Sequence, residues 1–273
     1  MSFEKITESV SNYQDLEKMS VSEILTNINN EDKTVANSVA LAKPQIEVLV
    51  NAVTEKLTAG GRLFYIGAGT SGRLGVLDAS ECPPTYGVSK DVVTGVIAGG
   101  DAALHTGIED AEDDQDQGWR DLLQEAISVK DVLVGIAASG ATPYVWNALK
   151  QAQKNGIVTG CIVCNPGSEV ARYADYPVEV IVGPEFVTGS TRMKSGTAQK
   201  LILNMITTTA MIKLGKVEGN RMIHMQLSND KLVDRGVKML MERTGLTYER
   251  AKIMLLEKGD IPSALAHFNA NHE

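Results

Sequence analysis

The chain has 273 residues and carries 34 Asp and Glu against 26 Lys and Arg, which gives a formal net charge of −8. An acidic chain with no basic block is a poor partner for nucleic acid, and no apolar run approaches the ~18–20 residues of a membrane span. The first residues hold no apolar signal core, and three cysteines do not make a disulfide framework, so we expect a cytoplasmic protein.

The first 60 residues are predicted to form a helical arm. Ser20 opens a short helix, and a longer helix covers residues 32–57 with a bend at Pro44. The second half of the longer helix is apolar at every third or fourth residue, which is typical of one buried face. The pair Gly60-Gly61 ends it.

From residue 62 the pattern changes to short apolar runs separated by helical segments. Most runs are bounded by Gly, Pro, Asn or Ser, and continuous apolar strands that alternate with helices indicate a parallel sheet covered on both faces. We therefore predict an α/β fold in which helices flank a five-stranded parallel sheet. The predicted strands are 62–66, 92–98, 132–137, 157–163 and 178–182.

The last third of the chain returns to helical patterns. A long helix over 191–214 is apolar on almost all sides, so other elements must cover it. Three short helices follow, with Thr247 as the N-cap of the second and Pro262 in the first turn of the third. The predicted organisation is a helical arm at 1–60, a sheet domain at 61–215 and a C-terminal helical module at 216–273.

The first predicted strand runs into the glycine-rich loop Gly67-Ala-Gly-Thr-Ser-Gly72. Its spacing matches the G-x-G-x-x-G of dinucleotide-binding folds. The fit is poor, because Asp101, the acid that would bind the ribose, follows the next strand only after two glycines. The loop also contains two hydroxyl side chains, and small hydroxyls at a helix N-terminus suit a terminal phosphate monoester. The predicted phosphate-binding residues here are Gly69, Thr70, Ser71 and Gly72.

A second loop repeats this chemistry after the third predicted strand. Ser139 and Thr142 carry hydroxyls, Thr142 can cap the next helix, and Pro143 suits its first position. Both loops follow the carboxyl ends of strands, where ligands of open α/β sheets bind. Either loop alone could be an ordinary turn with an N-cap. The two together favour phosphate binding, and the predicted ligands of this loop are Ser139, Gly140 and Thr142.

A third stretch, 183–200, enters the long helix. Ser190 or Thr191 is placed to cap it, whereas Arg192 and Lys194 put positive charge at a helix end that favours an acid. Cations at this position indicate an anion nearby, either a ligand or an acidic side chain. Ser190 and Lys194 complete the predicted set of binding residues.

The pair Cys161-Ile-Val-Cys164 lies in a predicted strand, where residues three apart face opposite sides of the sheet. One metal ion or one disulfide could not easily use both thiols, so we interpret these cysteines as structural. The histidines show no metal-ligand spacing with Cys, Asp or Glu. We therefore predict no metal site.

Together these stretches carry a specific resemblance. The two hydroxyl-bearing loops resemble the sugar-isomerase (SIS) phosphosugar-binding fold, and 183–200 looks like the signature shared by bacterial N-acetylmuramic acid 6-phosphate etherases and the animal glucokinase regulatory protein. The segment 69–87 is similar to the etherase branch, as is Ala98-Gly-Gly-Asp with the acidic run 109–114. The resemblance covers nearly the whole chain. A regulatory protein would carry two sugar-binding domains, and 273 residues hold one.

The resemblance implies a lyase that cleaves the D-lactyl ether of N-acetylmuramic acid 6-phosphate by elimination and hydration, with no metal or other cofactor. The family pattern places the acid and base on the Glu before Cys-Pro-Pro and the Glu of the Glu-Asp-Asp run, here Glu81 and Glu112. The chemistry needs such groups, because the departing lactate oxygen requires a proton and the hydrogen at C2 requires a base. We assign Glu81 as the acid and Glu112 as the base or water activator.

Plainer interpretations stay open at this stage. Glu112 lies in an acidic cluster of the kind that is usually solvated, and Glu81 stands beside a Pro-Pro turn, where a lone Glu is commonly a surface residue. Pro83 and Pro84 are predicted to terminate the helix that begins at the first glycine-rich loop. The same fold could also serve an aldose–ketose phosphosugar isomerase or a non-catalytic phosphosugar sensor. The apolar helix at 191–214, and a fold that typically completes its pockets across an interface, predict a homodimer.

Overall fold

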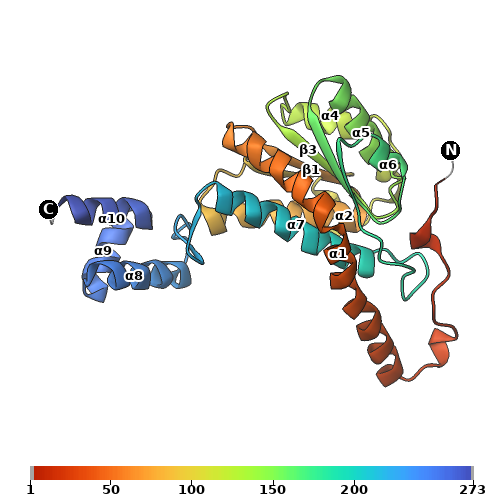
Figure 1. Cartoon of the computed structure of the whole chain (residues 1–273), viewed down its shortest axis with the longest axis horizontal. Coiled ribbons are helices and arrows are strands. Elements are labelled where there is room, and N and C mark those ends of the chain that lie inside the picture. The colour runs from red at the N-terminus through yellow and green to blue at the C-terminus, as the bar shows by residue number, and fades with distance from the viewer. Residues whose placement is uncertain (1–2, 272–273) are drawn as a thin grey trace. The chain divides into compact units, whose positions relative to one another are not determined.

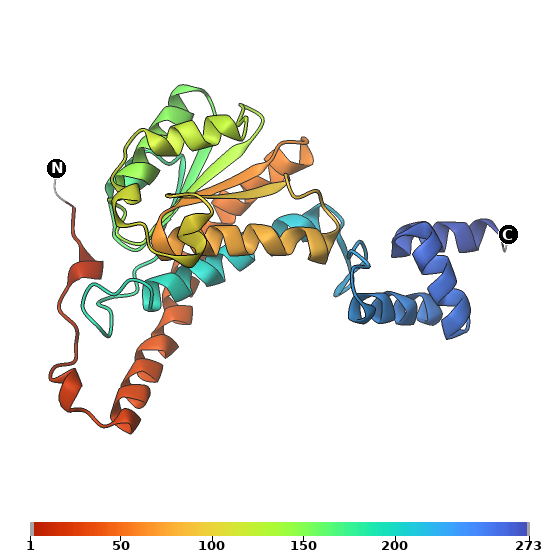
Figure 2. The same ribbon diagram turned by 180° about the vertical axis from the view of Figure 1, so that it is seen from behind.

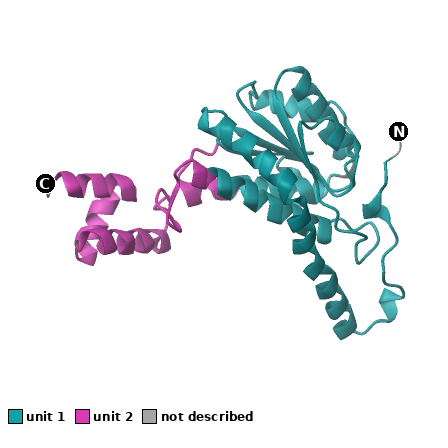
Figure 3. Cartoon of the chain, viewed as in Figure 1, with its two compact units in different colours: residues 1–79, 91–210 teal, residues 80–90, 211–273 magenta. Residues whose placement is uncertain are grey.

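The computed structural model describes residues 3–271 (Figure 1; from behind, Figure 2). The ends of the predicted arm and of the predicted C-terminal module, residues 1–2 and 272–273, lie outside this part. The chain separates into two compact units (Figure 3). Unit 1 is Met1–Ala79 with Asp91–Ala210, and unit 2 is Ser80–Lys90 with Met211–Glu273.

Unit 1 contains the predicted five-stranded parallel sheet, which confirms the fold class (Figure 1). The strands lie in the order β2-β1-β3-β4-β5. After β1 the chain adds β2 on one side and then β3, β4 and β5 on the other, so the topological switch point lies between β1 and β3. Ligands of such sheets bind outside the carboxyl ends of the strands at this point. The strands are β1 (Leu63–Gly67), β2 (Val93–Ile97), β3 (Val132–Ala137), β4 (Val158–Val163) and β5 (Tyr176–Glu179).

Strand β5 begins two residues earlier than predicted and ends three residues earlier. Its backbone pairs with Gly160–Val163 of β4, and this register places Tyr176 opposite Gly160. Val180 and Val182 are buried after the strand has ended. The apolar run that suggested a strand at 178–182 therefore covers both the end of the strand and the start of the buried loop after it.

Helices cover both faces of the sheet. On one face lie α4 (Gln117–Gln124), α5 (Pro143–Lys154) and the single turn α6 (Glu169–Arg172). On the other lie α1 (Val21–Thr58) and α2 (Gly69–Tyr86), and α7 (Lys194–Lys213) packs against α2 (Figures 1 and 2). Between β2 and α4 lie α3 (Ala102–His105) and the 3-10 turn η3 (Glu109–Glu112).

Helix α1 is continuous where a short and a longer helix were predicted. Ser20 is its N-cap, and Ser20 and Glu23 form a reciprocal capping box. Pro44 removes one backbone donor, but the buried face that follows, including Ile46 and Leu49, anchors the helix to the sheet. The first half of α1 projects beyond the sheet (Figure 1).

Two other helix boundaries differ from prediction. The prolines Pro83 and Pro84 lie inside the last turn of α2, which ends at Tyr86, whereas they were predicted to terminate it. Helix α7 begins at Lys194 rather than at residue 191, because an acidic side chain described below caps its first backbone N–H groups.

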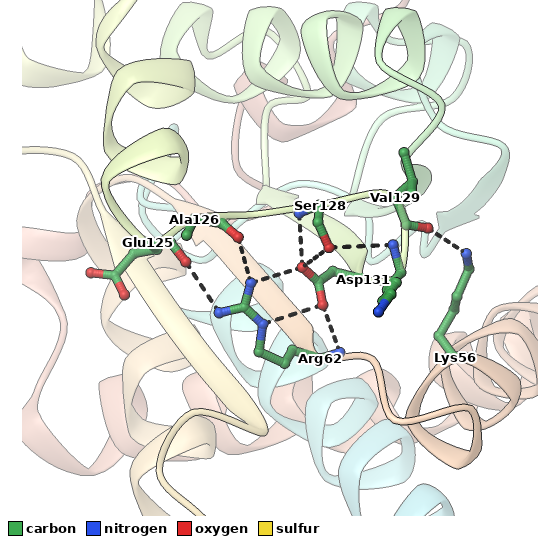
Figure 4. A network of polar contacts seen from close by, with 8 residues as sticks. Lys56, Arg62, Glu125, Ala126, Ser128, Val129 and Asp131 are labelled. Carbon is green, nitrogen blue, oxygen red and sulfur yellow. Dashed lines mark hydrogen bonds and ion pairs between the residues drawn. The ribbon is translucent and has the colours of Figure 1, made fainter.

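An ion-pair network joins the amino ends of β1 and β3, opposite the glycine-rich loops (Figure 4). The Asp131 carboxylate is almost fully buried and accepts hydrogen bonds from the backbone N–H groups of Arg62 and Ser128. The Arg62 guanidinium donates to Asp131 and to the carbonyl groups of Glu125 and Ala126. Ala126 has φ of 51°, so these contacts hold a non-glycine residue in the left-handed region.

All three cysteines are buried, and Cys161 and Cys164 are free thiols. Burial raises the pKa of both Cys161 and Cys164 to about 12, so neither thiol is a nucleophile at neutral pH. Cys161 packs in the core beneath α5, whereas Cys164 lies beside Ser195 of α7. The two thiols therefore occupy different environments.

Unit 2 contains the three predicted C-terminal helices and one short hairpin, β6 (Val217–Glu218) with β7 (Arg221–Met222). The helices α8 (Asp230–Thr244), α9 (Tyr248–Lys258) and α10 (Ile261–Ala270) enclose a small apolar core. Thr247 occupies the N-cap of α9, and Pro262 lies in the first turn of α10, as predicted. No helix within residues 3–271 is both long and apolar enough to span a bilayer.

Candidate active site

The loops after β1 and β3 line one pocket at the carboxyl edge of the sheet. Its volume is about 290 Å³. The structure therefore brings together two loops that are separated by about 70 residues in the chain. The predicted site residues that line this pocket are Gly69, Thr70, Ser71, Glu112, Ser139 and Thr142.

Close backbone contacts explain the glycine spacing of the first loop. A Cβ on Gly67 would lie 2.8 Å from the backbone N of Gly72, and a Cβ on Gly72 would lie 2.6 Å from Cγ1 of Ile97. Gly72 is buried behind the loop and does not line the pocket. The spacing thus serves a tight turn that brings the N-terminus of α2 to the pocket, where its first N–H groups suit an anion.

Ser71 contributes to the pocket differently from the prediction. Its hydroxyl donates a hydrogen bond of 2.9 Å to Oε1 of Gln199 on α7, so the hydroxyl proton is directed away from a ligand. Its backbone N–H, in the first turn of α2, is the group that suits an anion. The hydroxyl that the first loop can offer as a donor belongs to Thr70, which also lines the pocket.

The second loop presents its hydroxyls around the start of α5. Thr142 occupies the N-cap position, but its side chain makes no capping hydrogen bond, and it lines the pocket instead. The Ser139 hydroxyl accepts a hydrogen bond from the backbone N–H of Ala141. Gly140 does not line the pocket: it has φ of 67°, and a Cβ there would lie 2.2 Å from Oγ of Ser168. Its role is to make the turn.

An acidic side chain caps α7. Glu185 is 1% exposed and accepts hydrogen bonds from the backbone N–H groups of Lys194 at 2.8 Å and Ser195 at 2.9 Å. The Ser195 hydroxyl donates to the same carboxylate at 2.8 Å. Glu185 thus takes the capping role that the sequence had suggested for Ser190 or Thr191. The anion expected near this helix end is a side chain of the protein.

A second acidic side chain pairs with Lys194. The ammonium group of Lys194 is buried and contacts the Glu31 carboxylate of α1 at 2.5 Å. Burial alone would raise the pKa of Glu31, but the pairing with Lys194 and a hydrogen bond from Tyr13 outweigh it, so this pKa lies below its usual value. Lys194 and Ser190 do not line the pocket, whereas Thr191 does.

The two predicted catalytic carboxyl groups lie in different places. Glu112, at the end of η3, lines the pocket and also a neighbouring cavity of about 220 Å³. Glu81 is exposed and does not line the pocket. It lies on α2 twelve residues beyond Gly69, which is about 18 Å along a helix axis. The lining of the pocket therefore includes Glu112 and does not include Glu81.

A third carboxyl group, Glu8, was missed by the sequence analysis. It belongs to the short 3-10 turn η1 (Ile6–Glu8) and lines the pocket beside the two loops. No periodicity, glycine pattern or capping signal marks residues 6–11. Only the fold brings this segment to the sheet edge.

Another cavity, of about 740 Å³, lies beside the edge strand β2. Its lining includes five acids, Asp101, Asp110, Asp114, Asp121 and Glu125, so an anionic ligand would be repelled there. The smaller pocket, with its hydroxyl groups and helix N-termini, is the better candidate for a phosphorylated ligand. Within residues 3–271, no group of three His, Cys, Asp or Glu residues could hold a metal ion.

Comparisons with known proteins identify the family. The model of the glucokinase regulatory protein N-terminal SIS domain matches residues 45–153, and the SIS domain model matches 115–209. The chain is 61% identical to the N-acetylmuramic acid 6-phosphate etherase of Christiangramia forsetii over 96% of each chain. It is 58% identical to that of Bacteroides thetaiotaomicron over 100% of this chain and 98% of the other. This chain belongs to the N-acetylmuramic acid 6-phosphate etherase family.

Solved structures show that this chain shares its fold with sugar-phosphate isomerases. A phosphoheptose isomerase from Francisella tularensis aligns with a TM-score of 0.51 at 15% identity, covering 71% of this chain and 100% of that one. The phosphoheptose isomerase of Neisseria gonorrhoeae gives 0.51 at 16% identity, covering 69% and 97%. At such low identity the likeness concerns the SIS fold alone.

Proposed function

We propose that this protein is a carbon–oxygen lyase that cleaves the D-lactyl ether of N-acetylmuramic acid 6-phosphate, giving N-acetylglucosamine 6-phosphate and D-lactate. Its relatives at 57–61% identity over almost their full length are N-acetylmuramic acid 6-phosphate etherases. The observation that carries the proposal is the pocket itself, where two hydroxyl-bearing helix starts meet the carboxyl group of Glu112.

The phosphate would bind between the starts of α2 and α5. A protein of net charge −8 must hold a phosphate dianion through local groups. Backbone N–H groups at two helix N-termini supply positive partial charge, and the hydroxyls of Thr70, Ser139 and Thr142 supply hydrogen bonds. The sugar ring would then extend toward Glu112.

The reaction would proceed by elimination followed by hydration. A base removes the hydrogen at C2, the C3–O bond breaks, and a carboxylic acid protonates the departing lactate oxygen. Water then adds to C3 and a proton returns to C2, so both carboxyl groups end in their starting states. We assign removal of the C2 hydrogen, and its later return, to Glu112. Glu81 protonates the lactyl oxygen and, as the resulting carboxylate, accepts a proton from the water that adds to C3.

The position of Glu81 supports a homodimer. Glu81 does not line the pocket of its own chain, so we propose that the partner's Glu81 completes each site. The helices of unit 1 also expose large apolar side chains that a second copy could cover. These side chains are Leu25, Leu41, Val48, Leu77 and Met205.

The cysteines support a cytoplasmic location. Cys161 and Cys164 are buried thiols that form no disulfide, and such thiols fit a reducing compartment. We therefore propose that the protein works in the cytoplasm.

A D-lactate assay tests the proposed function. The purified protein should release D-lactate from N-acetylmuramic acid 6-phosphate in equal amount with N-acetylglucosamine 6-phosphate. An isomerase would rearrange a phosphosugar without releasing lactate, and a sensor would bind it without turnover. Either result would contradict the proposal.

Substitution of Glu112 tests the catalytic assignment within the same assay. Glu112→Gln should lower kcat by about 10²–10⁴-fold, the usual contribution of a general acid or base. The neighbouring exposed Asp113 provides the matched control, because Asp113→Asn removes the same charge one residue away. Unchanged turnover in Glu112→Gln would refute the role of this residue.

A further inference from the structure

The N-terminal segment, residues 6–11, is fastened to the edge of the sheet that carries the pocket. Thr7 is fully buried, and its backbone N–H donates to Oδ1 of Asn165 at 3.0 Å. The Ser11 hydroxyl donates to the carbonyl of Phe186 at 2.7 Å, and the Ser11 backbone N–H donates to Oγ1 of Thr188 at 2.9 Å. Both ends of the segment are thus held by residues that follow β4 and β5.

Asn165 connects this segment to the second phosphate loop. Its side-chain amide is fully buried and donates to Oγ1 of Thr7 and to the carbonyl of Ser139, both at 2.9 Å. One side chain therefore fixes the position of Thr7 relative to Ser139. A buried amide with three hydrogen bonds is costly to displace, so the segment and the loop behave as one wall of the pocket.

Glu8 follows Thr7 directly and lines the pocket beside Thr70, Ser139 and Thr191. A Cβ built on Gly189 would lie 3.2 Å from Oε2 of Glu8, so the carboxylate lies against the turn that leads into α7. The contacts of Thr7 and Asn165 leave Glu8 little freedom to move its backbone away from the cavity.

The carboxylate of Glu8 is suited to bind hydrogen-bond donors of a ligand. It accepts hydrogen bonds and donates none, and so does a phosphate dianion, so the two groups repel each other. The phosphate already has suitable partners at the starts of α2 and α5. The complementary groups for Glu8 are the donors of the sugar, its hydroxyl groups and the N–H of its acetamido group.

We propose that Glu8 binds the substrate by accepting a hydrogen bond from a donor on the sugar, and that Thr7 and Asn165 are positioning residues that hold it there. The proposal rests on the proposed phosphosugar substrate. It adds a recognition residue from the start of the chain to a pocket otherwise built from the sheet edge.

The test compares Glu8→Ala with Glu4→Ala, which removes an exposed carboxylate four residues earlier in the chain, outside the segment and outside the pocket. With N-acetylmuramic acid 6-phosphate, Glu8→Ala should raise KM about tenfold or more and change kcat less than about threefold, as expected for a lost charged hydrogen bond that acts in binding. Glu8→Gln, which keeps an acceptor oxygen, should fall between. Glu4→Ala should match the wild type.

Inorganic phosphate, used as a competitive inhibitor, separates recognition of the sugar from damage to the fold. Because Glu8→Ala removes a negative charge, the variant should bind phosphate as tightly as the wild type or more tightly, while it binds the phosphosugar more weakly. Equal weakening toward both ligands would show a structural effect and overturn the proposal. An unchanged KM, or a loss confined to kcat, would also overturn it.

Thr7→Val removes one hydrogen bond to Asn165 and leaves the Glu8 carboxylate in place. It should raise KM in the same direction as Glu8→Ala but by less, again with undiminished phosphate binding. If the wild type releases no D-lactate, the proposed function fails. The role of Glu8 is then still decided by calorimetric binding of N-acetylglucosamine 6-phosphate to the wild type, Glu8→Ala and Glu4→Ala, where equal affinities would refute it.

Discussion

Asp131 is a buried carboxylate that contributes to stability rather than to the pocket. Burial alone would raise its pKa, but hydrogen bonds from the Arg62 guanidinium and from the backbone N–H groups of Ser128 and Arg62 outweigh this effect, and the pKa lies below its usual value. A carboxyl group whose pKa is lower in the folded state stabilises the protein above its unfolded pKa of about 3.9. That stabilisation is lost as the pH falls through the folded-state pKa.

Asp131→Asn should therefore lower the free energy of unfolding at pH 7 by about 2–3 kcal/mol, because hydrogen bonds to a buried charge are weakened or lost. It should also flatten the pH dependence of stability below about pH 5. Chemical denaturation at pH 7, 5 and 4 measures both effects. Asp101→Asn, at an exposed position, is the control, and a variant that keeps the wild-type pH dependence would contradict this account.

At the level of elements, the start of α7 depends on a residue from the preceding loop. Glu185 supplies the acceptors for the first N–H groups of the helix and for the Ser195 hydroxyl, in a site that excludes water. Thr191, three residues before the helix, lines the pocket. The cap therefore connects the stability of α7 to the shape of the site.

Glu185→Ala should destabilise the protein by about 1–3 kcal/mol, because it leaves buried N–H groups without acceptors. In a protein of this size the melting temperature should fall by several degrees. Glu169→Ala is the matched control, since it removes only a partly exposed ion pair with Arg172 and should have little effect. Equal melting temperatures for the two variants would show that Glu185 is not an essential cap.

The sequence was sufficient to predict the elements whose signals are local. The short apolar runs, most of them bounded by Gly, Pro, Asn or Ser, placed four of the five strands closely, and β3 matches its predicted limits. The limits of the helices were harder to predict. A proline in the sequence shows that one backbone hydrogen-bond donor is missing, but packing decides whether the helix continues past Pro44 or Pro84. The shift of β5 has the same origin, since its limits follow from its pairing with β4.

The residues of the site also differ in whether local sequence patterns or distant contacts determine their positions. The two hydroxyl-bearing loops have local patterns and were predicted to lie at the same edge of the sheet, where they line one pocket. Lys194 was predicted as a ligand, but its partner Glu31 lies 163 residues away in the chain, where no spacing rule could reveal the pair. Glu8 was invisible for a similar reason, because it enters the pocket through contacts of its neighbour Thr7 with Asn165.

At the level of the whole molecule, a dimer with shared sites makes a quantitative prediction. Glu81→Gln and Glu112→Gln should each abolish most activity. A hybrid dimer with one copy of each variant should regain about half of the wild-type activity, because one of its two sites has both carboxyl groups intact.

Co-expression of the two variants with different affinity tags allows the hybrid to be isolated for the lactate assay. The control is a dimer in which both copies carry Glu112→Gln with the two different tags, and this dimer should stay inactive. Recovery no greater than that of this control would place both carboxyl groups of a site in one chain.

The contact between Thr7 and Asn165 also has a consequence for the order in which the protein is assembled. The two residues are 158 positions apart, so Thr7 cannot dock until the chain has been synthesised beyond β4. Bringing such distant residues together is slow in folding, because the chain between them must first be ordered. The pocket is thus among the last features to form, and a nascent chain holds no complete binding site until its sheet is nearly finished.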